Sequence, residues 1–457
     1  MTTAIAVPEA VSAAQKTPSE KFPLTPLERF LWSCHDNSHS MVIRAVLHFT
    51  GEVDAERLMQ AYREVMQRHP LLRSRVVGAG SSARWQEDPA VSDLVLVQEN
   101  ELRDATDSPS ADQEAGVRTR VAIGDHRAIA CCDIQHACCD GQGARQFISE
   151  WWMIYDHLLR GKSPALTRLD PARLAARGDI APRRGEQRVD FWQGLRNFYV
   201  TIRGRTARLP RRDRRKSNEL SNGLLVERII ERHEMAAVRS RLKSCDATIN
   251  DLGLAASLLA FRNNFTHLAD NHYLTVANPV DRRTISDLRL SAANRWGLAF
   301  LRRKVADCEE LSSLLRSVHG EMQYVKSHRV ADEFLRGLTL ASRISWGLRL
   351  VQAARLFTPT FQFTCVGEST RTTRNILSVA DGSTMIGQLQ LKGIAAYAPP
   401  APDVPLSICF LETNDRLSIT VTGNAKFVDA SNVNGMADRL QQIILSWSLE
   451  EPRGGDA

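Results

Sequence analysis

The sequence predicts an α+β protein made of two subdomains, and three observations support this prediction. First, the chain has 457 residues, 43% of them hydrophobic, whereas a single hydrophobic core stops growing at about 250–300 residues. Second, both halves mix helical and strand patterns without regular strand–helix–strand alternation, which indicates mixed β-sheets. Third, the segment 161–222 is rich in proline, arginine and glycine, and a connection of that length is unusual within one domain.

These observations divide the chain into five segments. We expect a polar leader at 1–20, an N-terminal subdomain at 21–175, a basic crossover linker at 176–222, a C-terminal subdomain at 223–450 and a tail at 451–457. The leader and the tail are predicted to be disordered. The leader also lacks the basic and apolar regions of a signal peptide.

Local patterns predict the elements of the first half. A threonine N-cap followed by proline predicts a helix at 26–33. A run of β-branched and apolar residues predicts a strand at 41–49. An aspartate N-cap and an apolar stripe predict a helix at 54–69, which a proline ends. Short strands are expected next at 72–77, 83–86, 94–97, 117–123 and 127–134, followed by a helix at 143–159.

The second half repeats this mixture of elements. Strands are expected at 224–230, 273–277, 296–304, 360–366, 385–390, 406–411 and 416–423. Helices are expected at 234–244, 249–265 and 429–447, with two long helices between 309 and 357. The apolar stretch 344–357 is predicted to belong to the core, because its interspersed arginines give an amphipathic pattern. A position beside a lipidic acceptor channel is the alternative.

The net charge of +7 originates in one segment. Residues 181–216 carry eleven arginines and one lysine against three acidic residues, a net charge of +9. The run 203–216 lacks interleaved aromatic side chains and any recognisable nucleic-acid module, so no nucleic-acid partner is expected. A solvated linker is the default interpretation, and attraction of an anionic ligand is the alternative.

Cysteine usage and hydropathy exclude other classes of protein. Nine cysteines, mostly in apolar runs, favour reduced thiols and a cytoplasmic location. The pairs Cys131-Cys132 and Cys138-Cys139 do not predict a metal site, because adjacent strand residues point to opposite faces. The most apolar run, 252–261, is shorter than the ~20 residues that a membrane span needs, so no transmembrane segment is expected.

The stretch Ile134-Gln-His-Ala-Cys-Cys-Asp-Gly141 joins a predicted strand to a predicted helix. A side chain at such a junction can project into a cleft while its backbone stays rigid. His136 could accept a proton from an alcohol or an amine, because its ordinary pKa is about 6.5. Asp140 could fold back under the loop, and Gly141 could relieve a tight bend. Taken alone, His136 could equally be a hydrogen-bonded, half-buried histidine and Asp140 the N-cap of the helix.

Four further segments accompany this stretch, at 22–30, 51–73, 278–283 and 293–297. They resemble, in order and spacing, motifs of the CoA-dependent acyltransferase superfamily, in which H-x-x-x-D-G is the signature. That superfamily includes chloramphenicol acetyltransferase, nonribosomal peptide condensation domains, wax ester synthases and alcohol acyltransferases. The resemblance extends over almost the whole chain, from about 22 to 447.

The resemblance implies two chloramphenicol-acetyltransferase-like subdomains with mixed β-sheets, arranged as a V around a central tunnel. His136 would be the general base that activates the acceptor. Asp140 and Gly141 would shape the loop, and Asp140 would pair with Arg283 across the halves. Asn294 and Thr364 are candidates for contacts to the oxyanion or the tunnel.

The implied reaction is acyl transfer from a thioester to a hydroxyl or an amine, in secondary or lipid metabolism. The donor would be acyl-CoA or a phosphopantetheine thioester on an acyl carrier protein, and no permanently bound cofactor is expected. The basic linker could attract either anionic donor. A monomer is favoured.

Two alternatives remain at this point. The chain could be a free-standing condensation-type domain that works with carrier proteins, or a non-catalytic relative that binds a partner. Many relatives carry a second histidine before the signature, where this chain has Gln135. That first position is generally not the base, so the substitution leaves activity possible but in need of a test.

Overall fold

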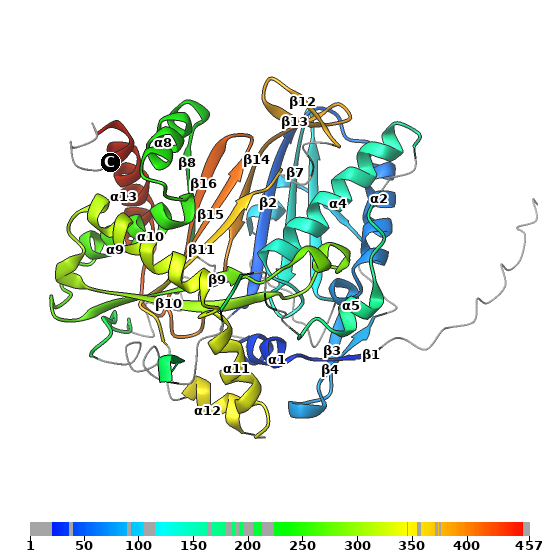
Figure 1. Cartoon of the computed structure of the whole chain (residues 1–457). Coiled ribbons are helices and arrows are strands. Elements are labelled where there is room, and N and C mark those ends of the chain that lie inside the picture. Colours follow the sequence, from blue (N-terminus) through cyan, green and yellow to red (C-terminus); the bar gives the residue numbers. More distant parts are fainter. Residues whose placement is uncertain are drawn as a thin grey trace, which may run out of the picture.

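The computed structural model describes residues 21–35, 40–88, 93–104, 115–162, 166–179, 182, 185–187, 192–194, 204–212, 224–344, 346–353, 358–370, 373 and 376–450. Two large β-sheets lie next to each other in these ranges, and helices cover their outer faces (Figure 1). Each large sheet has its own hydrophobic core cluster, and the cluster of the first sheet includes residues of the C-terminal half such as Trp296 and Leu389. The α+β class and the two sheet-rich halves are therefore confirmed. The expected leader, the expected tail and most of the linker lie outside the described residues.

The first sheet has seven strands in the order β12-β13-β14-β2-β7-β6-β5. These strands are β2 (Val42–Thr50), β5 (Val95–Val97), β6 (Val117–Gly124), β7 (Arg127–Gln135), β12 (Ser378–Ala380), β13 (Ser383–Ile386) and β14 (Leu389–Tyr397). Helices α2 (Ala55–Arg68) and α4 (Gly141–Leu159) pack together beside it. Burial alternates along most of β2, whereas the last six residues of β7 are all buried, as in a strand covered on both faces.

The second sheet has six strands in the order β10-β9-β11-β15-β16-β8. These strands are β8 (Leu224–Ile230), β9 (Tyr273–Asp281), β10 (Trp296–Lys304), β11 (Phe361–Glu368), β15 (Leu406–Thr413) and β16 (Arg416–Gly423). Its outer face is covered by α8 (Arg232–Ser244), α9 (Ile249–Asn264), α10 (Leu311–Ser327) and α13 (Ala430–Leu449) (Figure 1). β11 pairs in parallel with both neighbours, so the sheet is mixed as expected.

Smaller elements complete the described chain. A three-stranded sheet is formed by β1 (Lys21–Pro23), β4 (Arg84–Glu87) and β3 (Ser74–Val77). The other helices are α1 (Pro26–Ser33), α3 (Glu99–Asp104), α5 (Pro171–Ala175), α11 (Asp332–Ala341) and α12 (Gly347–Ala353). Within the described ranges, no helix combines the length and the hydropathy that a bilayer span requires.

Strands β12, β13 and β14 come from the C-terminal half of the sequence but extend the first sheet. β14 pairs antiparallel with β2, with Ala396 opposite Ala45. The boundary expected at residue 223 therefore does not separate the two sheets completely, because residues 378–397 follow it in the sequence but lie in the first sheet. Local alternation predicts a strand but contains no information about its partner, so the sequence could not reveal this exchange.

Two local expectations were wrong. The described residues of 309–357 form three helices instead of two long ones, and Arg329, in a left-handed conformation (φ 54°), separates the first of them from the second. The stretch 344–357 does not simply join the core, because the side chains of Ile344, Trp346 and Leu350 are 47%, 57% and 53% exposed. Residues 354–357 lie outside the described chain.

Candidate active site

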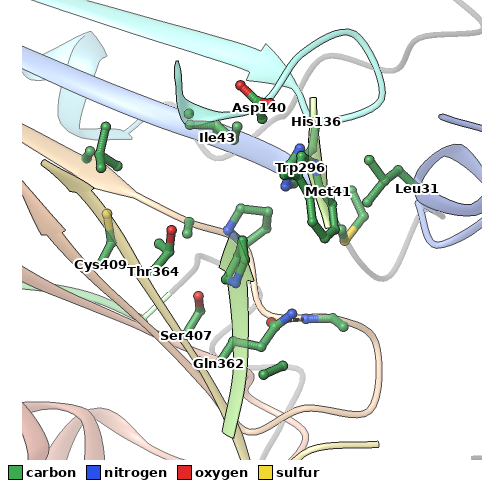
Figure 2. A pocket seen from close by; sticks show the side chains of 18 of the residues that line it. Leu31, Met41, Ile43, His136, Asp140, Trp296, Gln362, Thr364, Ser407 and Cys409 are labelled. Atoms are coloured by element: carbon green, nitrogen blue, oxygen red, sulfur yellow. Dashed lines mark hydrogen bonds between the residues drawn. The ribbon is translucent and has the colours of Figure 1, made fainter. Parts of the chain in front are cut away.

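His136 follows the last residue of β7, in the turn that leads into α4. Its backbone N–H donates to the carbonyl of Met41, at 2.8 Å, so the ladder between β2 and β7 continues to the site residue. The side chain is half-buried and lines a cavity between the two large sheets (Figure 2). A strand end therefore holds the histidine rigidly while its ring faces open space.

The hydrogen bonding of His136 determines which ring nitrogen is basic. Its Nδ1 lies 3.2 Å from the carbonyl oxygen of Cys139. A carbonyl only accepts, so Nδ1 carries the hydrogen and Nε2 keeps its lone pair in the neutral ring. Burial lowers the pKa of His136, although the nearby Asp140 carboxylate opposes this effect. The imidazole is therefore held neutral and ready to accept a proton.

Asp140 is both the N-cap of α4 and half of an ion pair. Its Oδ1 accepts from the backbone N–H of Gly143, and its Oδ2 accepts from that of Arg295, both at 2.8 Å. Arg283 donates to both carboxylate oxygens, at 2.9 Å each. Burial would raise the pKa of Asp140, but the guanidinium and the two backbone donors hold it below its ordinary value. Asp140 is thus both the N-cap of α4 and the partner of Arg283, so these two interpretations are compatible.

Arg283 lies two residues beyond β9, so its pairing with Asp140 joins the two halves of the chain. The guanidinium also contacts Asp281 at 3.1 Å and donates to the carbonyl of Ala293 at 2.8 Å. Arg283, Asp140 and His136 all line the same cavity.

Asn294 lies under the same loop. Its amide nitrogen donates to the carbonyls of His136 and Ala137, at 3.0 and 2.8 Å. Its amide oxygen accepts from the indole N–H of Trp296 at 3.1 Å. The side chain is buried and both amide hydrogens are engaged, which favours a positioning role over contact with an oxyanion.

Two glycines begin α4, and the structure assigns them different roles. Gly141 does not have a positive φ, and a Cβ there would meet only Val366, at an ordinary 3.5 Å. The expectation that Gly141 relieves a tight bend was therefore wrong. At Gly143 a Cβ would approach the Cβ of Cys139 to 2.8 Å and the backbone nitrogen of Ala293 to 3.1 Å. The second glycine allows the close contact between α4 and the 290s segment.

Further residues of the site escaped the sequence analysis. His69 is fully buried, and its Nδ1 accepts from the backbone N–H of Ala292 at 3.0 Å. Its Nε2 lies 3.4 Å from Oε2 of Glu150, and the same oxygen accepts a hydrogen bond from Nε of Arg68 at 2.5 Å. The arginine–histidine–proline stretch at 68–70 was the available signal. The proline of this stretch predicted the end of α2. The histidine also connects that end to the segment before β10, through its hydrogen bond with Ala292.

Aromatic rings flank the candidate base. The ring of Trp296 lies 5.9 Å from that of His136, and Phe334 stacks on the far side of Trp296 at 6.3 Å. Phe30 in turn meets Phe334 edge to face at 5.7 Å. These rings exclude water from one side of His136, which is consistent with its lowered pKa.

The cavity has a volume of about 460 Å³ and is mainly apolar. One face of four adjacent strands forms one wall, as the pairing register shows. The residues of that wall are Ala277, Pro279, Leu298, Phe300, Gln362, Thr364, Ser407, Cys409 and Leu411. Thr364 lies on this wall, across the cavity from His136 and Trp296 (Figure 2).

A second set of polar contacts, in addition to the Asp140–Arg283 pair, joins the two halves near the start of α4. Gln142 donates to the carbonyl of Val366 at 2.8 Å, and Arg145 donates to the carbonyl of Glu368 at 2.8 Å. Polar contacts thus join the two halves at two places beside the cavity, one through Arg283 and one through β11. Among the described residues, no cluster of three histidine, cysteine or carboxylate side chains could hold a metal ion.

Comparisons with known proteins agree with this geometry. The sequence matches the Condensation domain family over residues 19–447. A nonribosomal peptide synthetase of Aspergillus terreus, tpzA, is 25% identical over 147 residues, which cover 31% of this chain and 6% of that synthetase. This chain thus corresponds to a small part of a curated relative.

Two solved structures share the fold at low identity. The epimerization domain from the third module of tyrocidine synthetase B has a TM-score of 0.67 at 15% identity, over 96% of this chain and 98% of that one. The trichothecene 15-O-acetyltransferase TRI3 of Fusarium sporotrichioides has a TM-score of 0.64 at 12% identity, over 93% of this chain and 95% of that one. The superfamily that the motifs indicated is confirmed, and the chain belongs to the Condensation domain family.

Proposed function

We propose that this protein transfers an acyl group from a thioester to a hydroxyl or an amine, with His136 as the general base. One observation carries the proposal. Because Nδ1 of His136 donates to the carbonyl of Cys139, Nε2 keeps its lone pair, and the side chain lines an apolar cavity between the sheets. A neutral imidazole in such a position is suited to accept a proton from a weakly acidic nucleophile.

The reaction balances with His136 alone as the proton carrier. Nε2 takes the proton of the acceptor O–H or N–H while that oxygen or nitrogen bonds to the thioester carbonyl carbon. The resulting tetrahedral intermediate collapses, the carbon–sulfur bond breaks, and the imidazolium returns the proton to the thiolate. The products are an ester or an amide and a free thiol.

The polar network behind the loop would hold the base in place during these steps. Asp140 and Arg283 pair at the end of the turn, and Asn294 donates to the carbonyls of His136 and Ala137 within it. Such a rigid support matters because small displacements of a catalytic group reduce rates steeply.

The test is a screen of acyl-CoA donors against alcohol and amine acceptors, followed by mass spectrometry. With any productive pair, His136→Ala should lower kcat by about 10²- to 10⁴-fold, the usual contribution of a general base. His48→Ala, at an exposed position of β2, is the matched control and should keep full activity. Wild-type rates from His136→Ala with an unchanged melting temperature would exclude His136 as the base.

The same screen distinguishes the donors. Turnover with acyl-CoA identifies a free-standing acyltransferase, whereas turnover only with acylated carrier protein identifies a condensation-type domain. If wild-type protein turns over no donor but binds a carrier protein as tightly as His136→Ala does, the proposed catalysis is wrong and a partner-binding role replaces it.

A further inference from the structure

An exposed surface of mixed apolar and basic character lies on α11, α12 and the connection between them. We call it the α11–α12 face. It consists of Leu340, Ile344, Trp346 and Leu350, together with the exposed Arg343 and the half-buried Arg336. These helices project at the lower end of the molecule in Figure 1, away from the helices that cover the two sheets. The four apolar side chains are 64%, 47%, 57% and 53% exposed.

Beyond the first turn of α11, which carries Asp332 and Glu333, the charge on this part of the chain has one sign. Residues 334–367 contain four arginines and neither aspartate nor glutamate. Arg336 contacts Glu333, which belongs to the first turn of α11. Arg343 is exposed beside Leu340 and Ile344. The charge therefore suits an anionic surface, and the neighbouring side chains suit an apolar one.

We propose that the α11–α12 face docks on the surface of a lipid bilayer that contains anionic lipids. Helical segments that bind in the plane of a membrane combine large apolar side chains with arginine or lysine, and tryptophan is favoured at the boundary between headgroups and acyl chains. Clustered exposed apolar side chains of this size mark an interaction site on a protein surface. The arginines add attraction to the headgroups.

The inner side of the same helices contributes to the cavity. Phe334 of α11 stacks on Trp296, which faces His136, and both Phe334 and Val351 of α12 line the cavity wall. One element pair thus has its outer side exposed and its inner side at the candidate active site. This link favours a bilayer over a protein partner, because a lipophilic substrate held in the membrane would then lie next to the mainly apolar cavity. That last step rests on the proposed function, whereas the docking itself does not.

The test is flotation of the full-length protein with vesicles. Vesicles of phosphatidylcholine and phosphatidylglycerol in equal amounts should carry the protein, and vesicles of phosphatidylcholine alone should carry much less. Trp346→Ser with Leu350→Ser, and separately Arg336→Glu with Arg343→Glu, should each weaken binding about tenfold or more. Added salt should weaken binding of the wild type, because it screens the arginines.

Matched controls use exposed residues on other elements. Val379→Ser with Leu449→Ser removes two apolar side chains that are 56% and 79% exposed. Arg173→Glu with Arg439→Glu reverses two exposed charges. Both control pairs should float like the wild type, and all variants should keep its melting temperature.

The docking and the chemistry can fail separately. His136→Ala should float as well as the wild type, whatever the activity screen gives. Equal flotation of the wild type, the Trp346→Ser pair and the Arg336→Glu pair would overturn the proposal. A lack of vesicle binding by the wild type would also overturn it. In that case, a concentration-dependent dimer, or a complex with acidic carrier protein, that those substitutions abolish would identify what binds the α11–α12 face instead.

Discussion

Asp140 and Arg283 carry the strongest prediction at the scale of single residues. The carboxylate is buried and accepts four hydrogen bonds, two of them from the guanidinium. Asp140→Ala removes the bidentate partner of Arg283 and leaves the backbone N–H groups of Gly143 and Arg295 without their acceptor, so it should lower the free energy of unfolding by about 3–5 kcal/mol and also reduce the rate. Chemical denaturation and kcat measure the two effects.

A double-mutant cycle with Arg283→Met controls this prediction. The double variant should be more stable than the sum of the single losses predicts, because each single loss already includes the loss of the same ion pair. Asp140→Ala with wild-type stability and activity would show that the ion pair positions nothing.

Glu150 gives the fold a dependence on pH. Burial would raise its pKa, but His69, Arg68 and Gln146 lower it from 4.5 to about 2. Because the pKa is lower in the folded state, the contribution is fully present above about pH 4.5 and is lost as the pH falls toward 2. It amounts to about 3 kcal/mol at neutral pH.

The pH dependence of unfolding tests this contribution. Between neutral pH and about pH 3, the wild type should lose more stability than Glu150→Gln, since the variant has no carboxyl group to titrate. Parallel stability curves for the two proteins would contradict the lowered pKa.

At the scale of elements, the start of α4 depends on a close approach to the segment before β10. Gly143→Ala should destabilise the protein by about 1–3 kcal/mol, because its new methyl group would overlap Cys139 and press on Ala293. Gly141→Ala is the matched control two residues away and should leave the melting temperature almost unchanged. Equal melting temperatures for both variants would show that the two segments can separate without cost.

Capping also acts at this scale, and the sequence predicted it well. Thr25 accepts from the backbone N–H of Glu28, and Asp54 accepts from that of Arg57. Both caps were expected from residue type and position, because a cap is a contact between neighbours in the chain. The left-handed Arg329 that separates α10 from α11 was not predicted, since arginine has no special preference for that conformation.

At the scale of the whole molecule, the exchange of β12, β13 and β14 makes the first sheet depend on both halves. A fragment of residues 21–175 would lack the strand that pairs with residues 44–50 of β2. We expect this fragment to lack a cooperative thermal transition and dispersed amide resonances, because its β2 edge and core would be exposed. A folded, monomeric fragment would show that the exchanged strands are dispensable.

The sequence by itself determined the fold class, most elements, the superfamily and the pairing of Asp140 with Arg283 that the superfamily motifs implied. These features depend on local pattern or on motifs that are contiguous in the chain. His136 was identified as the candidate base in the same way, and its role stays a proposal.

Only the tertiary structure decided which distant segments meet. It placed β14 beside β2, brought His69 to Ala292, engaged both amide hydrogens of Asn294 and made Gly143, not Gly141, the glycine where a side chain would clash. It also left Ile344, Trp346 and Leu350 exposed, although the pattern of 344–357 had suggested a core helix. The physical reason is common to all of these cases, since strand partners, buried hydrogen bonds and solvent exposure depend on residues that are far apart in the chain.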